Sequence, residues 1–307
     1  MPREVFGPGY AFLPKTALLT FEEMARLTRV CIGLGVEKVR LTGGEPLLRK
    51  DLDRLVSLLA AIPGLRDLTL TTNGSLLASK ARLLHDAGLG RLTVSLDSLD
   101  DAVFRRMNDA DFTVAEVLRG IDAALAAGFA PVKINAVIRR GVNESDIVPL
   151  ARRFSGPEFI VRFIEYMDVG NTNGWRLTEV VSAAEITARL AAEFPLEPLR
   201  PNYVGEVARR FRTRAGGEIG VISSVTQPFC GDCSRARFSS DGHLFTCLFA
   251  SEGRDLRTPL RTGASDSQLA AIIGTRWQDR SDRYSELRGR LSERNNETKV
   301  EMSAIGG

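Results

Sequence analysis

The chain has 307 residues, of which 44% are hydrophobic and 26% charged, so it is long enough to bury one α/β barrel or two ordinary globular domains. Its net charge of +3 excludes a polybasic nucleic-acid-binding protein, although the arginines suit a phosphorylated small molecule. No apolar run reaches the roughly 18 residues of a membrane span, and the start of the chain lacks a secretory signal. We therefore expect a cytoplasmic protein that binds neither membranes nor nucleic acid.

Short apolar strands alternate with amphipathic helices through the first half of the chain. We expect strands at 36–42, 67–72, 91–97, 131–138 and 158–167, and helices at 51–62, 79–87, 101–108, 114–127 and 144–154. This alternation predicts βαβ units and a parallel sheet. Gly64, Gly88 and Gly128 follow three of the helices, where a left-handed cap residue is favoured.

The alternation ends after residue 170. We expect a helix at 182–194, an antiparallel pair within 203–225, a cysteine-bearing segment at 226–250 and a helical stretch at 266–291. The predicted organisation is a partial β/α barrel over 1–175, a C-terminal α+β domain over 176–292 and a mobile tail over 293–307.

Polar residues stand at the ends of all five predicted strands. They occur in "TGGEP" (42–46), "TTNG" (71–74) and "SLD" (95–97), at Lys133 and Asn135, and at Glu165. In parallel β/α folds, ligands bind at the carboxyl ends of the strands, so this ring predicts a polar ligand over the barrel mouth. Paired glycines in "TGGEP" would let the backbone lie against that ligand, although a tight turn alone would also explain them.

Three of the four cysteines are close together in the sequence. Cys230, Cys233 and Cys247 follow the pattern C-x₂-C-x₁₃-C, in which two thiolates converge and a returning segment brings the third. A four-iron cluster with one open position fits this spacing. A Cys₃His zinc site that includes His243 fits it as well, and His243 could also be a plain turn residue. The fourth cysteine, Cys31, lies on the apolar side of a helix and is expected to pack in the core.

Two arginines follow the first cysteine pair in the stretch "SRAR". Arg235 and Arg237 are two residues apart, so in an extended segment their side chains point to the same side. Paired guanidinium groups match phosphate oxygens, although a solvated surface pair is the simpler alternative.

These stretches together resemble the GTP 3′,8-cyclase family of molybdenum cofactor biosynthesis, whose members are radical S-adenosylmethionine enzymes. The resemblance covers essentially the whole chain in order and rests on "FGPGYAFLPK", "LLTFEE", "VRLTGGEPLLRKDL", "LTTNG", "VSLDSLD", "RFIEYMDVGNTNGW", "FCGDCSRARFSSDGHLFTCLF" and the terminal "IGG". It implies an incomplete (β/α)₆ TIM-like radical SAM barrel, here without its first strand, closed by a C-terminal α+β domain. It also favours iron–sulfur over zinc at the cysteines.

The resemblance implies a site residue by residue. It implies that a [4Fe-4S] cluster is held by Cys230, Cys233 and Cys247, that S-adenosylmethionine is contacted by Gly44, Ser95 and Met167, and that GTP is contacted by Arg40, Thr71, Lys133, Arg235, Ala236 and Arg237. The implied reaction converts GTP to 3′,8-cyclo-7,8-dihydro-GTP, through abstraction of a ribose hydrogen and carbon–carbon closure onto the purine. The implied partners are GTP, a cyclic pyranopterin monophosphate synthase acting downstream, and a second copy in a homodimer. Gly306 and Gly307 match a tail that reaches the active site.

One part of the family pattern lies before residue 1 of this sequence. The family opens with a first barrel strand, an arginine and a C-x₃-C-x₂-C loop that binds a second four-iron cluster, and Met-Pro follows the last of those cysteines. This sequence starts at Met1 and Pro2. We expect the natural chain to start further upstream. The alternatives are a non-catalytic GTP-binding remnant with one cluster and a zinc-stabilised β/α binding protein. Without a preceding strand, 36–42 is expected to be an open sheet edge.

Overall fold

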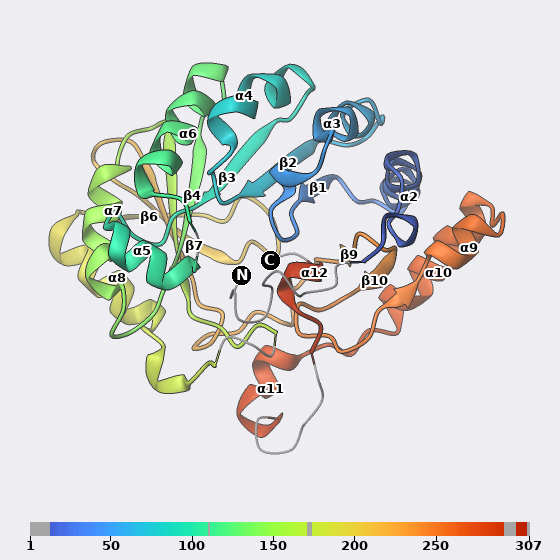
Figure 1. Cartoon of the computed structure of the whole chain (residues 1–307). Helices are drawn as coiled ribbons and strands as arrows, with labels where there is room; N and C mark the ends of the chain where they lie inside the picture. Colours follow the sequence, from blue (N-terminus) through green and yellow to red (C-terminus); the bar gives the residue numbers. More distant parts are fainter. Residues whose placement is uncertain (1–12, 110, 171–173, 292–298, 306–307) are drawn as a thin grey trace.

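The computed structural model describes residues 13–109, 111–170, 174–291 and 299–305 (Figure 1). The strands are β1 (Lys38–Leu41), β2 (Asp67–Thr72), β3 (Arg91–Ser95), β4 (Val132–Ile138), β5 (Phe159–Glu165), β6 (Glu197–Leu199), β7 (Ala208–Arg212), β8 (Glu218–Ile222), β9 (Arg237–Phe238), β10 (His243–Phe245) and β11 (Arg254–Asp255). They form a large sheet in the order β1-β2-β3-β4-β5-β8-β7-β6 and a small sheet of β11, β10 and β9.

The large sheet is parallel from β1 to β5 and on to β8, and antiparallel at β7 and β6. The predicted parallel β/α half and the predicted antiparallel pair are thus both confirmed. Within the described residues β1 pairs only with β2, so it is the expected sheet edge. The sheet continues past residue 175, because β6, β7 and β8 extend it beyond β5.

Helices connect the strands and cover one side of the sheet. They are α2 (Phe21–Gly33), α3 (Leu52–Ala60), α4 (Leu77–Asp86), α5 (Asp101–Asn108), α6 (Val114–Ala127), α7 (Ile147–Arg153), α8 (Ala183–Glu193), α9 (Arg257–Arg261), α10 (Asp266–Gln278), α11 (Tyr284–Leu291) and α12 (Met302–Ile305), with 3₁₀ turns η1 (Lys15–Ala17), η2 (Pro46–Leu48), η3 (Glu144–Asp146) and η4 (Leu177–Glu179). Figure 1 shows α3 to α8 outside the curved sheet, while α9 to α12 and the small sheet lie across its open side.

The ends of these helices follow the sequence signals. Gly64, Gly88 and Gly128 have φ angles of 91°, 98° and 106°, which confirms the predicted left-handed positions after the helices. Thr20 and Glu23 form a capping box at the start of α2, in which each side chain accepts from the other residue's backbone N–H. Local sequence therefore defines both ends of several helices.

The two faces of the large sheet differ in chemistry. The helix-covered face is apolar, and Leu70, Leu92, Ile134 and Val161 on it are completely buried. Because side chains alternate along a strand, the neighbouring residues face the other way, into the concave side. The register lines these residues up across the sheet, as the pairs Thr69–Arg91, Thr93–Lys133 and Asn135–Arg162 show. The concave face is therefore polar.

A second, smaller core joins α2 to the C-terminal elements. Leu27, Val30 and Cys31 of α2 pack with Leu244, Leu256, Leu260, Leu269 and Ile273. Ala25, on another side of the same helix, belongs to the main core. The prediction that Cys31 is a packing residue is confirmed: it is 8% exposed, and burial raises the pKa of its thiol to about 12.

Several expectations need correction or refinement. The helical stretch predicted over 266–291 is two helices, because α10 ends at Gln278 and α11 starts only at Tyr284. Asp282 in the intervening turn accepts a hydrogen bond from the Thr246 hydroxyl, which draws this turn toward the small sheet. The short strands β6, β9, β10 and β11 were not expected. Residues 299–305 of the predicted tail are packed, with Ile305 3% exposed, whereas Gly306 and Gly307 lie outside the described residues.

Among the described helices, none combines the length and the apolar composition needed to cross a membrane.

Candidate active site

Five positively charged side chains lie close together on the concave face of the sheet. This cationic cluster consists of Lys38 and Arg40 on β1, Arg91 on β3, Lys133 on β4 and Arg162 on β5. The register places them on one face, and each of them perturbs the pKa of at least one other member. Such crowding of like charges needs an anion to balance it.

Lys133 is the most perturbed member of the cluster. Its residue is only 8% exposed. Burial, together with the charges of Arg162, Arg91, Lys38 and Arg40, lowers the pKa of its ammonium group to about 7. A lysine in such a position holds its proton weakly until an anion arrives.

Arg40 and Arg162 are enclosed by the same surroundings. Burial, reinforced by the charge of Arg162, lowers the pKa of Arg40, although its side chain remains open to solvent. Both observations hold if Arg40 faces a water-accessible hollow inside the fold, where atoms surround it on most sides. Burial also lowers the pKa of Arg162.

Buried polar atoms without a hydrogen-bond partner mark the same face. They are the Thr71 hydroxyl, the Asn135 amide oxygen and the Arg162 Nε. Buried polar groups in proteins are nearly always paired, so three unpaired ones on neighbouring strands indicate a polar ligand. Two of them, Thr71 and Asn135, lie in the predicted ring of strand-end residues.

Acidic residues balance only part of the cationic cluster. Asp67 accepts hydrogen bonds from Arg91 and lies 3.3 Å from the Lys38 Nζ. Glu206 lies 3.7 Å from Arg162. In the part of the chain that the structure describes, no carboxylate pairs with Arg40 or Lys133.

The three clustered cysteines lie beside this face as free, half-buried thiols. The Cys233 backbone N–H donates to the Cys230 carbonyl in a tight turn, and Cys247 follows β10. The charge of Cys230 acts on the pKa of Cys247, and the thiols of Cys247 and Cys233 both act on the pKa of Arg237. The three sulfur atoms are therefore neighbours in space, as the spacing predicted.

The predicted arginine pair lies between these thiols and the cationic cluster. Arg235 donates to the Cys233 sulfur at 3.3 Å and stacks over Phe229. Burial and the charge of Arg235 lower the pKa of Arg237 to about 10, and Arg40 acts in the same direction. Ala236 is exposed between them. The structure thus brings "SRAR" near strand β1, which lies about 200 residues away in sequence.

The cysteine arrangement fits a multi-iron cluster better than a single ion. Among the residues that the structure describes, no three His, Cys, Asp or Glu side chains could hold one metal ion. A zinc site requires all its ligands around one centre, whereas each thiolate of a four-iron cluster binds a different iron and stands further from the others. His243, the fourth ligand of the zinc alternative, instead lies with its Nδ1 3.1 Å from an Asp241 carboxylate oxygen. The donor set of three thiols beside guanidinium groups suits an iron–sulfur cluster.

The residues implied for S-adenosylmethionine occupy strand ends at the same edge of the sheet. Gly44 is exposed after β1, Ser95 ends β3 and Met167 follows β5. Gly43 has a φ of 143° and open space around it, so the backbone there is accessible as predicted. Glu45 accepts hydrogen bonds from the Thr72 hydroxyl and the Asn73 backbone, which ties this turn to the end of β2.

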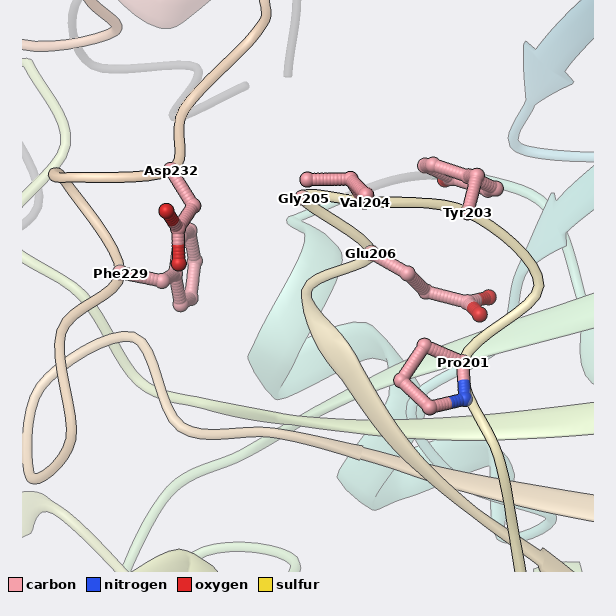
Figure 2. A pocket seen from close by; sticks show the side chains of 7 residues that line it. All are labelled: Pro201, Tyr203, Val204, Gly205, Glu206, Phe229 and Asp232. Carbon is pink, nitrogen blue, oxygen red and sulfur yellow. The ribbon is translucent and has the colours of Figure 1, made fainter.

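A cavity of about 460 Å³ opens next to the cationic cluster. Figure 2 shows Phe229 and Asp232 of the cysteine segment on one side, facing the β6–β7 connection on the other. Two residues of that connection reach the cluster, because the Tyr203 ring lies over the Lys38 ammonium and Glu206 faces Arg162.

Sequence reasoning missed Lys38, Arg91 and Arg162. Arg162 gave the clearest signal, as a lone charge inside the apolar run "FIVRFIE". Lys38 and Arg91 have flanking polar residues, and only the sheet register shows that they face Lys133.

Comparison with known proteins identifies the family. Residues 7–154 match the Radical SAM superfamily and residues 159–286 match Molybdenum Cofactor Synthesis C. The GTP 3′,8-cyclase of Acidothermus cellulolyticus is 55% identical, in an alignment that covers 100% of this chain and 91% of the relative. The chain belongs to the GTP 3′,8-cyclase family of radical SAM proteins. Family members named GTP 3′,8-cyclase from Xanthomonas axonopodis and Staphylococcus saprophyticus are 50% and 45% identical, with the same coverage.

Solved structures agree on the fold of this GTP 3′,8-cyclase family member. Streptococcus suis SuiB bound to S-adenosylmethionine superposes with a TM-score of 0.62 over 96% of this chain and 72% of SuiB, at 13% identity. At that identity the likeness concerns the fold alone. It confirms the predicted partial TIM-like radical SAM barrel.

Proposed function

We propose that this chain is a GTP 3′,8-cyclase, which converts GTP to 3′,8-cyclo-7,8-dihydro-GTP in the first step of molybdenum cofactor biosynthesis. The observation that carries this proposal is the cationic cluster, in which Lys133 and Arg40 have no carboxylate partner in the described structure, next to three neighbouring thiols. A nucleoside triphosphate supplies several negative charges in a row. Family membership supports the same substrate, because the closely similar relatives are named for it.

In this proposal the cationic cluster and the arginine pair bind the nucleotide. Arg40, Lys133 and Arg162 neutralise the phosphates, and the unpaired Thr71 hydroxyl donates to an oxygen of the nucleotide. Arg235, Ala236 and Arg237 approach from the cysteine side. Because the phosphates are held at several points, the purine and ribose are oriented toward the thiols, and this ordering is what the protein contributes to the reaction.

Cys230, Cys233 and Cys247 hold a [4Fe-4S] cluster in this proposal. Three ligands leave one iron able to bind the purine base, which is the chemistry that the cluster supplies when bound. Arg235 favours the thiolate form of a ligand: burial raises the pKa of Cys233, but the charge and hydrogen bonds of Arg235 outweigh it and leave the pKa below its usual value.

Gly44, Ser95 and Met167 contact S-adenosylmethionine in this proposal. The radical SAM family also uses an iron–sulfur cluster to cleave that cofactor, and the residues of this chain do not fit a second cluster. The one remaining cysteine, Cys31, is packed in the core beneath α2. We therefore assign no radical-generating step to residues of this chain. The expected setting is the cytoplasm, where GTP is found, with a homodimer and a downstream cyclic pyranopterin monophosphate synthase as partners.

Anaerobic reconstitution with iron and sulfide tests the cluster assignment. We expect about four irons per chain and absorbance near roughly 400 nm. Replacing Cys230, Cys233 or Cys247 by Ala should abolish both, whereas Cys31→Ala is the matched control and should retain them. Stoichiometric zinc with no visible absorbance would overturn the assignment.

Calorimetric titration with GTP tests the nucleotide site separately. We expect Lys133→Met and Arg162→Met to weaken GTP binding at least tenfold, since each removes a charged hydrogen bond. Exposed Arg66, which pairs with Glu37 on the outer surface, offers a control variant, Arg66→Met. Equal affinity in all three variants would contradict the site.

A further inference from the structure

A buried network at the end of β5 connects three distant parts of the chain. Asp168 is 8% exposed and accepts hydrogen bonds from the Tyr284 hydroxyl at 2.5 Å and the Arg288 Nε at 2.7 Å. The Lys299 ammonium donates to the Asp168 carboxylate at 3.0 Å and also to its backbone carbonyl at 2.9 Å. These four residues are called the Asp168 clamp.

Aromatic rings enclose the cations of the clamp. Phe249 stacks on Tyr284 with ring centroids 4.5 Å apart. The Lys299 ammonium lies 4.4 Å from the Tyr284 centroid, and the Arg288 guanidinium lies 5.4 Å from the Phe249 centroid. Burial tends to raise the pKa of Asp168, but Tyr284, Arg288 and Lys299 outweigh it and leave the pKa below its usual value. The carboxylate is therefore charged and fully used.

The clamp determines the course of the segment 299–305. Next to Lys299, the Val300 backbone N–H donates to the Ala250 carbonyl at 3.0 Å. Glu301 lies directly against Gly170, where a Cβ would meet its carboxylate at 2.2 Å. Ile305 then returns to a buried position, and Figure 1 shows α12 near the middle of the molecule.

The clamp also lies between the two proposed cofactor sites. Asp168 directly follows Met167, and both Phe249 and Ala250 belong to the segment just after Cys247. A segment held at Lys299 and Val300 therefore joins the end of β5 to the segment that carries the third thiol.

We propose that Asp168 is a positioning residue that fixes the C-terminal segment 299–305 against the end of β5 and the Cys247 segment. It acts through Lys299, Arg288 and Tyr284 and contacts no substrate. Removing its charge releases the segment and loosens the Cys247 segment from β5. The second consequence rests on the proposed cluster, whereas the first does not.

Hydrogen exchange measured by mass spectrometry tests the first consequence. Asp168→Asn should speed exchange in the peptide that contains 299–305 by about tenfold or more, because a charged hydrogen-bond acceptor is lost. Lys299→Gln should have a similar effect, Lys299→Arg should restore part of the protection, and the double variant should open no further than either single one. Asp146→Asn is the matched control, since Asp146 is also 8% exposed but lies between β4 and α7.

Unchanged exchange of this peptide in folded Asp168→Asn protein would overturn the proposal, as would equal acceleration in Asp146→Asn. Chelator challenge of the reconstituted protein tests the second consequence, and Asp168→Asn should lose iron several-fold faster than the control. Faster exchange with unchanged iron loss would refute the link to the Cys247 segment alone. Absence of any iron from wild-type protein would refute the proposed cluster and leave the exchange result standing.

Discussion

At the scale of single residues, the buried cation Lys133 decides most about the site. It stands in the middle of a parallel sheet, with four other positive charges on the same face and no carboxylate partner in the described structure. Such a side chain weakens the unliganded fold and strengthens the binding of an anion. This trade of stability for affinity is common at functional sites.

The pH dependence of stability should reveal this cost. The folded-state pKa of Lys133 is about 7, whereas the unfolded chain keeps the lysine proton up to about 10.5. Between those values the unfolded state binds more protons, so this group makes the free energy of unfolding rise with pH. We expect Lys133→Met to remove a rise on the order of 3 kcal/mol between pH 7 and pH 10.5.

Urea unfolding of nucleotide-free protein at several pH values measures that difference. Lys50 is an exposed lysine outside the cluster, and Lys50→Met serves as the control for loss of a charge. Parallel pH profiles for wild type and Lys133→Met would show that Lys133 is charged and well solvated in the fold.

Single residues also show what the sequence could reveal of the site. Cysteine spacing and the "SRAR" stretch can be read locally, because their partners lie within a few residues or one turn. Lys38 and Arg91 could not be found in this way, since their role depends on the register of β1, β2 and β3. Register is a property of the assembled sheet.

At the scale of elements, Glu165 joins three segments at the end of β5. Its completely buried carboxylate accepts from the backbone N–H groups of Ala183 at 2.6 Å, Val225 at 2.7 Å and Thr226 at 2.8 Å. These bonds attach the start of α8 and the segment after β8 to the strand. The same segment leads on to the first cysteine pair.

Glu165→Gln should destabilise the protein by about 1.5–3 kcal/mol, because an amide group then faces backbone donors that need acceptors. Chemical denaturation measures the change. Glu185→Gln on the solvent side of α8 is the control and should cost less than about 1 kcal/mol. A Glu165 variant as stable as the Glu185 variant would show that the buried carboxylate is dispensable.

Elements differed in how well sequence predicted them. The β/α half followed its apolar periodicity closely, and β2, α5 and α6 have the predicted bounds. The strands β9, β10 and β11 are two or three residues long, too short for a periodic pattern, and form only because they pair with one another. The break between α10 and α11 likewise depends on the contact between Asp282 and Thr246.

At the scale of the whole molecule, α2 connects the two cores. One side of this helix packs in the main core through Ala25, and another packs against the C-terminal helices through Leu27 and Val30. A helix near the start of the chain therefore holds elements that lie more than 200 residues later. Sequence periodicity predicted the helix face but could not indicate two different partners.

Leu27→Ala should destabilise the molecule by about 2–5 kcal/mol, because Leu27 is 1% exposed and its removal leaves a cavity between the cores. Denaturation followed by both circular dichroism and tryptophan fluorescence tests this expectation, since both tryptophans lie in the C-terminal half, at 175 and 277. Leu34→Ala, at a 48% exposed position just after the same helix, is the control. A loss below about 1 kcal/mol would show that α2 is not shared between the cores.

The polar concave face has a practical consequence for every solution measurement on this protein. A hollow lined by unbalanced ammonium and guanidinium groups attracts whatever small anions the buffer contains, and it does so without regard to the nucleotide. Inorganic phosphate or sulfate then occupies the very positions that a triphosphate needs. Apparent nucleotide affinities will accordingly fall in phosphate buffer, while melting temperatures rise in the same solution.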